Sequence, residues 1–207
     1  MELRQYQKDV LNNIILSNKN GNDKIILQAA TGSGKTVMSS ALIRYFVGKG
    51  SSVVFLAHRR ELIIQASKTM SKLGVGHGII MAGISANGFE SVQVASIDTL
   101  RARAIDTNKM DLPPANLLVI DEAHRSMSPT YLKLIEKYKE LYDPLIVGLT
   151  ATPVRADGTG LGLVYSDMVK APGIKELTAL GSLVEADYYA PTVPDLRRVG
   201  TVAGDYN

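Results

Sequence analysis

Eight residues with an unusual mix of side chains follow a short apolar run near the start of the chain. Residues 29–36 read AATGSGKT, directly after IILQ. Glycines let a backbone curl so that successive amides converge on an anion, and a helix that begins there adds the positive end of its dipole. We therefore predict that residues 29–36 form a phosphate-binding loop. The alternative is a flexible strand-to-helix turn with an incidental lysine.

The side chains of this loop suit a nucleoside triphosphate with its metal ion, so ATP and Mg²⁺ are the predicted cofactors. The Lys35 ammonium would reach the β- and γ-phosphates, and the Thr36 hydroxyl would hold Mg²⁺. The strict P-loop pattern begins with glycine, whereas this sequence has Ala29 at that position. The residues of the loop predicted to bind the nucleotide are Thr31, Gly32, Ser33, Gly34, Lys35 and Thr36.

Two adjacent carboxylates stand where a second apolar run ends, in the stretch NLLVIDEAH at 116–124. Such a pair is costly at the edge of a core unless a positive group neutralises it. Asp121 would bind the Mg²⁺ ion, through water, and Glu122 would orient and deprotonate the attacking water. Together with Lys35, they are the predicted catalytic residues. The alternative is that both acids simply favour the start of the next helix.

Thr150 and Thr152 form a third polar segment, within GLTATP at 148–153. Their hydroxyls could bond to the acidic segment and report whether a γ-phosphate is present, which would couple the nucleotide to the rest of the protein. Taken alone, the segment would be read as a strand end that threonines cap before Pro153.

The pattern of apolar residues predicts how these segments are positioned. Strands are expected at 24–29, 52–57, 78–82, 91–96, 116–121 and 144–150, with helical stripes over 37–46, 62–73 and 131–141. A short helix at 173–180 and a strand at 185–190 are expected in the tail. Strands that alternate with helices indicate an α/β fold, a mostly parallel sheet with helices on both faces. Ligands of such sheets bind at the carboxyl ends of the strands.

The composition of the 207 residues narrows the class of protein. Apolar residues make up 45% of the chain, enough for a full core, and the net charge of +3 permits a polyanionic partner without requiring one. No apolar run approaches the ~20 residues of a membrane helix, and the N-terminus does not resemble a leader. The absence of cysteine excludes disulfides and thiolate metal sites, so we expect a cytoplasmic protein without a membrane partner.

Six motifs in this order resemble those of superfamily 2 helicases and nucleic-acid translocases: LRQYQ, AATGSGKT, FLAHRRELIIQ, ASIDTL, DEAH and LTATP. The resemblance covers residues 3–190. The stretch GLTATPVRADGTGLG makes the chain most similar to the branch of RadD-like proteins, type III restriction motors and phage helicases. This resemblance implies a RecA-like P-loop NTPase fold and an ATP-hydrolysing lobe that acts with DNA, or alternatively with RNA.

The resemblance also assigns roles to individual residues. Gln7 would read the adenine edge, with Arg4 nearby, although LRQYQ also fits an ordinary amphipathic helix in which Tyr6 serves packing. The residues implied in contacts to the nucleic-acid backbone are His58, Arg59, Arg60, Ser96 and Thr99. Three further arginines could add to these contacts or be solvated surface charges: Arg101, Arg103 and Arg155.

In the family, ATP lies between two RecA-like lobes. We expect residues 1–190 to be the first lobe and 191–207 the start of the linker, with the second lobe absent and hydrolysis by this lobe weak. The leading hypothesis is that the chain is the ATP-binding lobe of a DNA helicase or translocase. The alternatives are a nucleotide-dependent module that binds DNA or a partner without turnover, the motor of a restriction complex, and a P-loop kinase.

Overall fold

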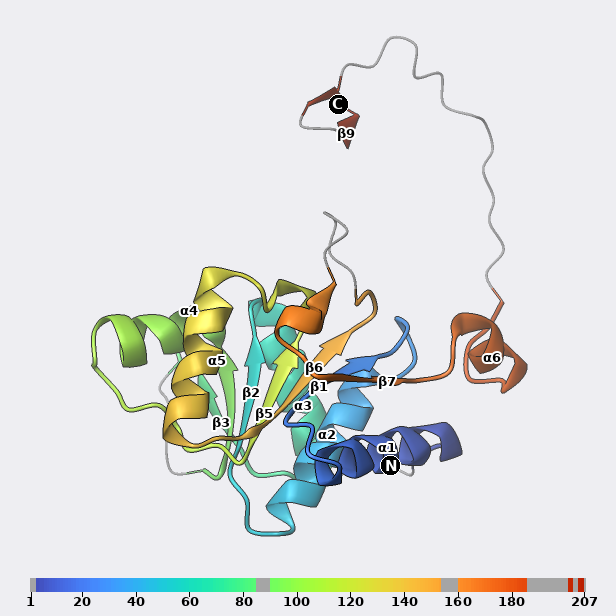
Figure 1. Ribbon diagram of the computed structural model, residues 1–207, viewed down its shortest axis with the longest axis horizontal. Coiled ribbons are helices and arrows are strands. Elements are labelled where there is room, and N and C mark those ends of the chain that lie inside the picture. The colour runs from blue at the N-terminus through green and yellow to red at the C-terminus, as the bar shows by residue number, and fades with distance from the viewer. Residues whose placement is uncertain (1–2, 85–89, 154–159, 186–200, 203–204, 207) are drawn as a thin grey trace.

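Seven strands form one parallel sheet through the centre of the protein (Figure 1). The computed structural model describes residues 3–84, 90–153, 160–185, 201–202 and 205–206. The strand order is β3-β4-β2-β5-β6-β1-β7. The strands are β1 (Lys24–Gln28), β2 (Val53–Ala57), β3 (Gly78–Ile80), β4 (Val92–Ser96), β5 (Leu117–Asp121), β6 (Leu145–Thr150) and β7 (Asp167–Lys170). Two short strands near the C-terminus, β8 (Thr201–Val202) and β9 (Asp205–Tyr206), pair antiparallel with each other.

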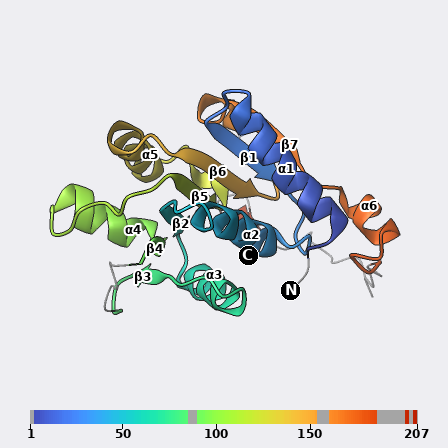
Figure 2. The same ribbon diagram turned by 90° about the horizontal axis from the view of Figure 1, so that it is seen from below.

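Helices cover both faces of the sheet, as Figure 2 shows from below. Side chains of α1, α2 and α3 pack into the core on one face, and those of α4 and α5 pack into the core on the other. The helical elements are α1 (Gln5–Lys19), α2 (Lys35–Val47), α3 (Arg60–Lys72), α4 (Ile97–Leu100), the π-helix η1 (Arg101–Asp106), the 3₁₀ turn η2 (Ala123–Arg125), α5 (Pro129–Leu141), the 3₁₀ turn η3 (Leu161–Leu163) and α6 (Ile174–Ala179). The predicted α/β fold is therefore confirmed.

The central strands are apolar along their whole length because both of their faces are covered. All five residues of β2 and all six of β6 are buried. A strand that packs against helices on both sides cannot alternate polar and apolar residues, which explains why the continuous runs in the sequence predict these strands well. Each of the six predicted strands of the sheet is present, and β3 is shorter than the expected 78–82.

The edge strand β7 was not predicted. It pairs with β1 in parallel, with Ile25 beside Asp167 and Gln28 beside Lys170. Only Val169 of its four residues is buried, so the segment carries no apolar run that would have indicated a strand. The strand predicted at 185–190 lies, except for its first residue, outside the described residues.

Gly148 in the middle of β6 is enclosed so tightly that alanine should not fit. An added Cβ would lie 2.5 Å from the Tyr165 hydroxyl oxygen and 2.7 Å from Cβ of Ala123. Because Tyr165 is also held by a 2.8 Å hydrogen bond to Ser126, its ring cannot simply move aside. We expect Gly148→Ala to lower the free energy of unfolding by about 1–3 kcal/mol, measured by urea denaturation.

Gly162→Ala is the matched control, since an added Cβ there meets no atom within 4 Å. Equal denaturation midpoints for the two variants would contradict the close packing of Gly148.

Among the helices of the described residues, none combines the length and the apolar character that crossing a bilayer requires.

Candidate functional site

The predicted phosphate-binding loop and the acidic pair lie at the same edge of the sheet. Strand β6 runs between β1 and β5, with Thr150 beside Gln28 on one side and Leu149 beside Asp121 on the other. Because neighbouring strands are about 4.8 Å apart, the ends of β1 and β5 lie about 10 Å apart. The loop with its lysine and the two carboxylates thus lie at one edge of the sheet, the edge proposed for the nucleotide.

The loop between β1 and α2 has the backbone conformation that its glycines permit. Gly32 and Gly34 have φ values of 82° and 86°, in the left-handed region that other residues rarely adopt. An added Cβ on Gly34 would also lie 2.7 Å from the side-chain nitrogen of Gln7. Both positions therefore need glycine for the loop to curl at the start of α2.

The Lys35 side chain folds back over this loop. Its Nζ donates hydrogen bonds to the carbonyl oxygens of Ala29 and Ala30, at 3.1 Å and 3.4 Å. Neutral carbonyls are weaker partners for an ammonium group than phosphate oxygens are. A bound phosphate would therefore compete well for the same donors.

The acidic pair is electrostatically unfavourable without a cation. Burial and the neighbouring Glu122 carboxylate raise the pKa of Asp121, and the Lys35 ammonium offsets part of that rise. Glu122 has a left-handed backbone, with φ of 53°, and its carboxylate lies 3.2 Å from Nδ1 of His124. A cation beside Asp121 would relieve the repulsion between the two carboxylates.

The donors present fit Mg²⁺ that arrives with a nucleotide. Within the described ranges, no group of three or more His, Cys, Asp or Glu side chains could hold a metal ion by itself. Mg²⁺ is commonly bound by one or two protein oxygens together with substrate phosphates. Thr36 and Asp121 are the residues that would supply the protein oxygens.

A cavity of about 370 Å³ adjoins the loop on the side of α1. It is lined by Arg4, Tyr6, Gln7, Gly32, Ser33, Gly34, Val37 and Ser182. Gln7 is only 5% exposed, and its side-chain oxygen accepts a 3.0 Å hydrogen bond from the Arg4 amide at the start of α1. The structure thus brings both residues predicted to contact the base to the glycines of the loop.

The chain can be assigned to a family by comparison with known proteins. The family model described as "Type III restriction enzyme, res subunit" matches residues 1–155. The chain belongs to this family. In Saccharomyces cerevisiae, "Putative ATP-dependent helicase IRC3" is 34% identical over 219 residues, which cover 99% of this chain and 31% of that protein. In Schizosaccharomyces pombe, "Putative mitochondrial ATP-dependent helicase irc3" is 33% identical over 178 residues, which cover 82% of this chain and 29% of that protein.

The chain thus spans about a third of the length of these two relatives. The predicted membership of the superfamily 2 helicase family is confirmed.

Solved helicase structures share the fold. The Hef helicase domain of Pyrococcus furiosus has a TM-score of 0.66 and 20% identity, covering 81% of this chain and 37% of that one. The UvsW helicase of bacteriophage T4 has a TM-score of 0.64 and 16% identity, and the match covers 82% of this chain and 60% of that chain. At these identities the likeness concerns the fold alone, and it confirms the RecA-like architecture.

In this restriction-family lobe, the residues predicted to contact nucleic acid gather around the ends of β2 and β4. Ala57, the residue before His58, lies beside Ser96 in the sheet. Arg59 and Arg60 open α3 and are both exposed. The Ser96 hydroxyl accepts a hydrogen bond from the Thr99 amide at 3.5 Å and so caps α4.

His58 and Arg59 also line a cavity of about 270 Å³ with Glu122, His124 and Arg125. Burial, followed by the charges of Arg125 and Arg59, lowers the pKa of His58. His58 is therefore a neutral hydrogen-bonding group at neutral pH. The positive charge at this edge comes from the arginines.

The three further arginines differ in their surroundings. Arg101 forms an ion pair with Asp106 at 3.2 Å and donates to the Thr130 hydroxyl at 3.4 Å, so its guanidinium already has partners within the protein. Arg103 lies on the π-helix η1 and is partly exposed. Arg155 lies outside the described residues.

Thr150, the last residue of β6, and Thr152 do not form the hydrogen bond to the acidic segment that the sequence led us to expect. The Thr150 hydroxyl donates to the carbonyl oxygen of Thr152 at 2.9 Å and accepts from the Thr152 amide at 3.1 Å. Its one proton is therefore used within the LTATP segment and is not donated to Asp121 or Glu122. The reason is local, because a hydroxyl at a strand end easily bonds to the backbone two residues on.

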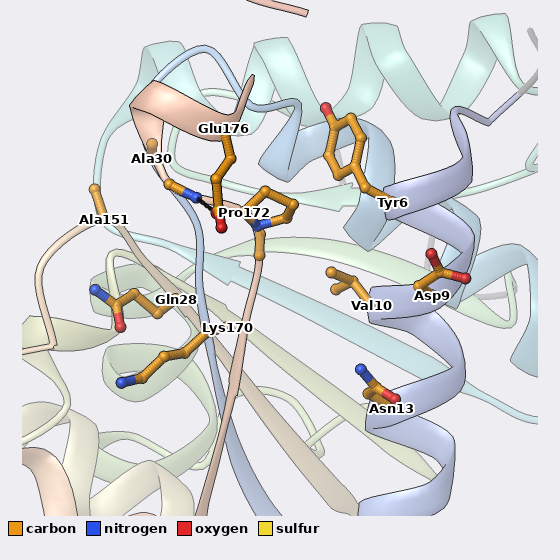
Figure 3. A pocket seen from close by; sticks show the side chains of 12 residues that line it. Tyr6, Asp9, Val10, Asn13, Gln28, Ala30, Ala151, Lys170, Pro172 and Glu176 are labelled. Carbon is orange, nitrogen blue, oxygen red and sulfur yellow. Dashed lines mark hydrogen bonds between the residues drawn. The ribbon is translucent and has the colours of Figure 1, made fainter. Parts of the chain in front are cut away.

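Tyr6 is a site residue that sequence reasoning assigned to packing alone. Its hydroxyl donates a 2.7 Å hydrogen bond to the Ser33 carbonyl, which ties α1 to the phosphate-binding loop. Tyr6 also lines a second cavity, of about 620 Å³, between α1 and the ends of β1 and β7 (Figure 3). Although this cavity is larger than the one beside Gln7, neither Gln7 nor the loop glycines Gly32 and Gly34 line it, so we do not assign it to the nucleotide.

Proposed function

We propose that this chain is the ATP-binding lobe of a motor that couples ATP hydrolysis to movement on DNA. The observation that carries the proposal is the shared edge of β1, β6 and β5, where the loop that bears Lys35 and the acidic pair lie close enough for the Lys35 charge to act on Asp121. The charge pattern supports Mg-ATP as the ligand. The loop offers amides and the Lys35 ammonium for the phosphates, and the acidic pair offers carboxylates for the metal ion.

The proposed roles follow from the chemistry of each group. Amides of the loop and the Lys35 ammonium would bind the β- and γ-phosphates, and Gln7, with Arg4, would face the base. Thr36 and Asp121 would hold Mg²⁺, which neutralises charge on the phosphates. Glu122 would accept a proton from the attacking water, and Thr150 and Thr152 would couple this event to the neighbouring strands.

We assign the nucleic acid to the edge formed by the ends of β2 and β4. Two exposed arginines at the start of a 13-residue helix, next to the Ser96 and Thr99 hydroxyls, suit the phosphates of a DNA backbone and offer no base-specific pattern. The yeast relatives are named ATP-dependent helicases, which supports a nucleic-acid partner for the motor.

Replacing both arginines should weaken DNA binding and reduce its dependence on salt. We expect Arg59→Gln/Arg60→Gln to reduce the slope of log affinity against log salt by about 1.4 for single-stranded DNA, about 0.7 for each lost phosphate contact. The measurement is fluorescence anisotropy of a labelled oligonucleotide over a range of KCl concentrations.

The control variant Lys68→Gln/Lys72→Gln removes the same charge from exposed positions farther along α3. A slope that changes equally in the two double variants would point to net charge and away from a defined contact. A parallel titration with RNA of the same sequence distinguishes the two nucleic acids.

A second candidate function is a nucleotide-dependent binding module without turnover. It would use the same loop and cavity for the nucleotide, with the Glu122 carboxylate held by Nδ1 of His124 at 3.2 Å instead of deprotonating water. Phosphate release measured on this chain with single-stranded DNA separates the two functions, since clear turnover excludes the module.

The boundary at residue 190 and the cytoplasmic compartment remain predictions.

A further inference from the structure

The turn that follows α6 is rigidly built. Gly181 has φ of 62°, and the amides of Ser182 and Leu183 both donate to the Leu177 carbonyl, at 2.8 Å and 3.1 Å. A left-handed glycine with two amides bonded back into the last turn is a common helix end. Leu177 itself is fully buried, so this end of α6 is anchored to the protein.

This turn contacts the phosphate-binding loop although it lies far away in the sequence. Arg4 donates from Nη1 to the Ser182 carbonyl at 3.1 Å, and Ser182 lines the cavity that also holds Gln7. Leu183 covers Gly32 so closely that a Cβ added to Gly32 would lie 3.0 Å from its methyl carbon Cδ2. Figure 1 shows α6 standing beyond the end of β7, at the margin of the sheet.

From these contacts we infer that the turn at residues 181–183 forms the outer wall of the base pocket and determines how well the lobe binds the base of its nucleotide. This inference rests on the proposed function. Val37 and Gly32 give the cavity an apolar surface, Leu183 packs on Gly32 at its margin, and the Gln7 amide offers donors and an acceptor. A flat heterocycle with a hydrogen-bonding edge fits both.

The phosphates should not depend on this turn. The loop is held from within by bonds from the Ser33 amide and hydroxyl to the Ala30 carbonyl, at 3.1 Å and 2.6 Å, and from α1 by the Tyr6 hydroxyl. Changes in the turn should therefore act on the base half of the ligand and leave the phosphate half intact.

The test compares two ligands, MgATP and Mg-tripolyphosphate, which lacks the base and sugar. We expect Leu183→Ala to weaken MgATP binding by about 5-fold to 30-fold, the loss that corresponds to a few buried methyl groups, and to leave tripolyphosphate binding unchanged. Isothermal titration calorimetry on the whole chain gives both affinities. Val184→Ala is the control, since Val184 is 91% exposed in the same segment.

A second variant fills the pocket without loosening the turn. Ser182→Phe should reduce MgATP affinity by more than about tenfold and spare tripolyphosphate, whereas Val184→Phe adds the same bulk outside the pocket and should affect neither. Unchanged MgATP binding in both Leu183→Ala and Ser182→Phe would overturn the inference, as would an equal loss for both ligands. Failure of the wild-type chain to bind MgATP at all would instead reject the proposed function.

Discussion

Replacing Glu122 by glutamine is expected to slow ATP hydrolysis by about 10²–10⁴-fold while ATP remains bound. The size of the effect is that of a lost general base, because an amide cannot accept the proton of the attacking water. Glutamine has the size of glutamate, so the left-handed backbone at this position and the packing of Ala123 should persist. Single-turnover phosphate release with single-stranded DNA present measures the rate.

The control for this variant is Glu136→Gln, which removes an equal charge from an exposed position on α5. Hydrolysis by Glu122→Gln at the rate of the control would remove Glu122 from the catalytic machinery. A wild-type chain that binds ATP and never releases phosphate, even when DNA and a second lobe are supplied, would favour the binding module.

Replacing Lys35 by alanine should act on binding itself. Its ammonium already points over the loop, bonded to the carbonyls of Ala29 and Ala30, and no other cation contacts those two oxygens among the described hydrogen bonds. Loss of a charged partner for the phosphates costs about 2–4 kcal/mol, so MgATP affinity should fall by about 30-fold to 700-fold. Isothermal titration calorimetry measures the affinity.

Lys19→Ala serves as the control, because Lys19 is exposed at the end of α1. Tripolyphosphate should lose affinity in Lys35→Ala to the same degree as ATP, in contrast to the base-pocket variants. Undiminished ATP binding by Lys35→Ala would end the proposal of a phosphate-binding loop.

Much of the fold follows from local sequence patterns. The strands β2, β5 and β6 are continuous apolar runs because helices cover both of their faces, and such a run differs clearly from the helical stripe of α3. Glycines and hydroxyl residues after β1 likewise indicate a tight turn that leads into a helix. These signals reside in a few neighbouring residues, so they can be read without knowledge of the tertiary structure.

Contacts between distant segments were decided only by the tertiary structure. β7 has one buried residue and exists because the free edge of β1 supplies its hydrogen bonds. The bond from Tyr6 to Ser33 and the packing of Leu183 on Gly32 depend on where α1 and α6 settle against the loop.

The Thr150 hydroxyl likewise bonds to a backbone partner that its residue type alone does not specify. A local pattern reports which groups a segment can offer. Which partner they meet depends on the free energy of packing the whole chain, to which residues far apart in the sequence contribute together.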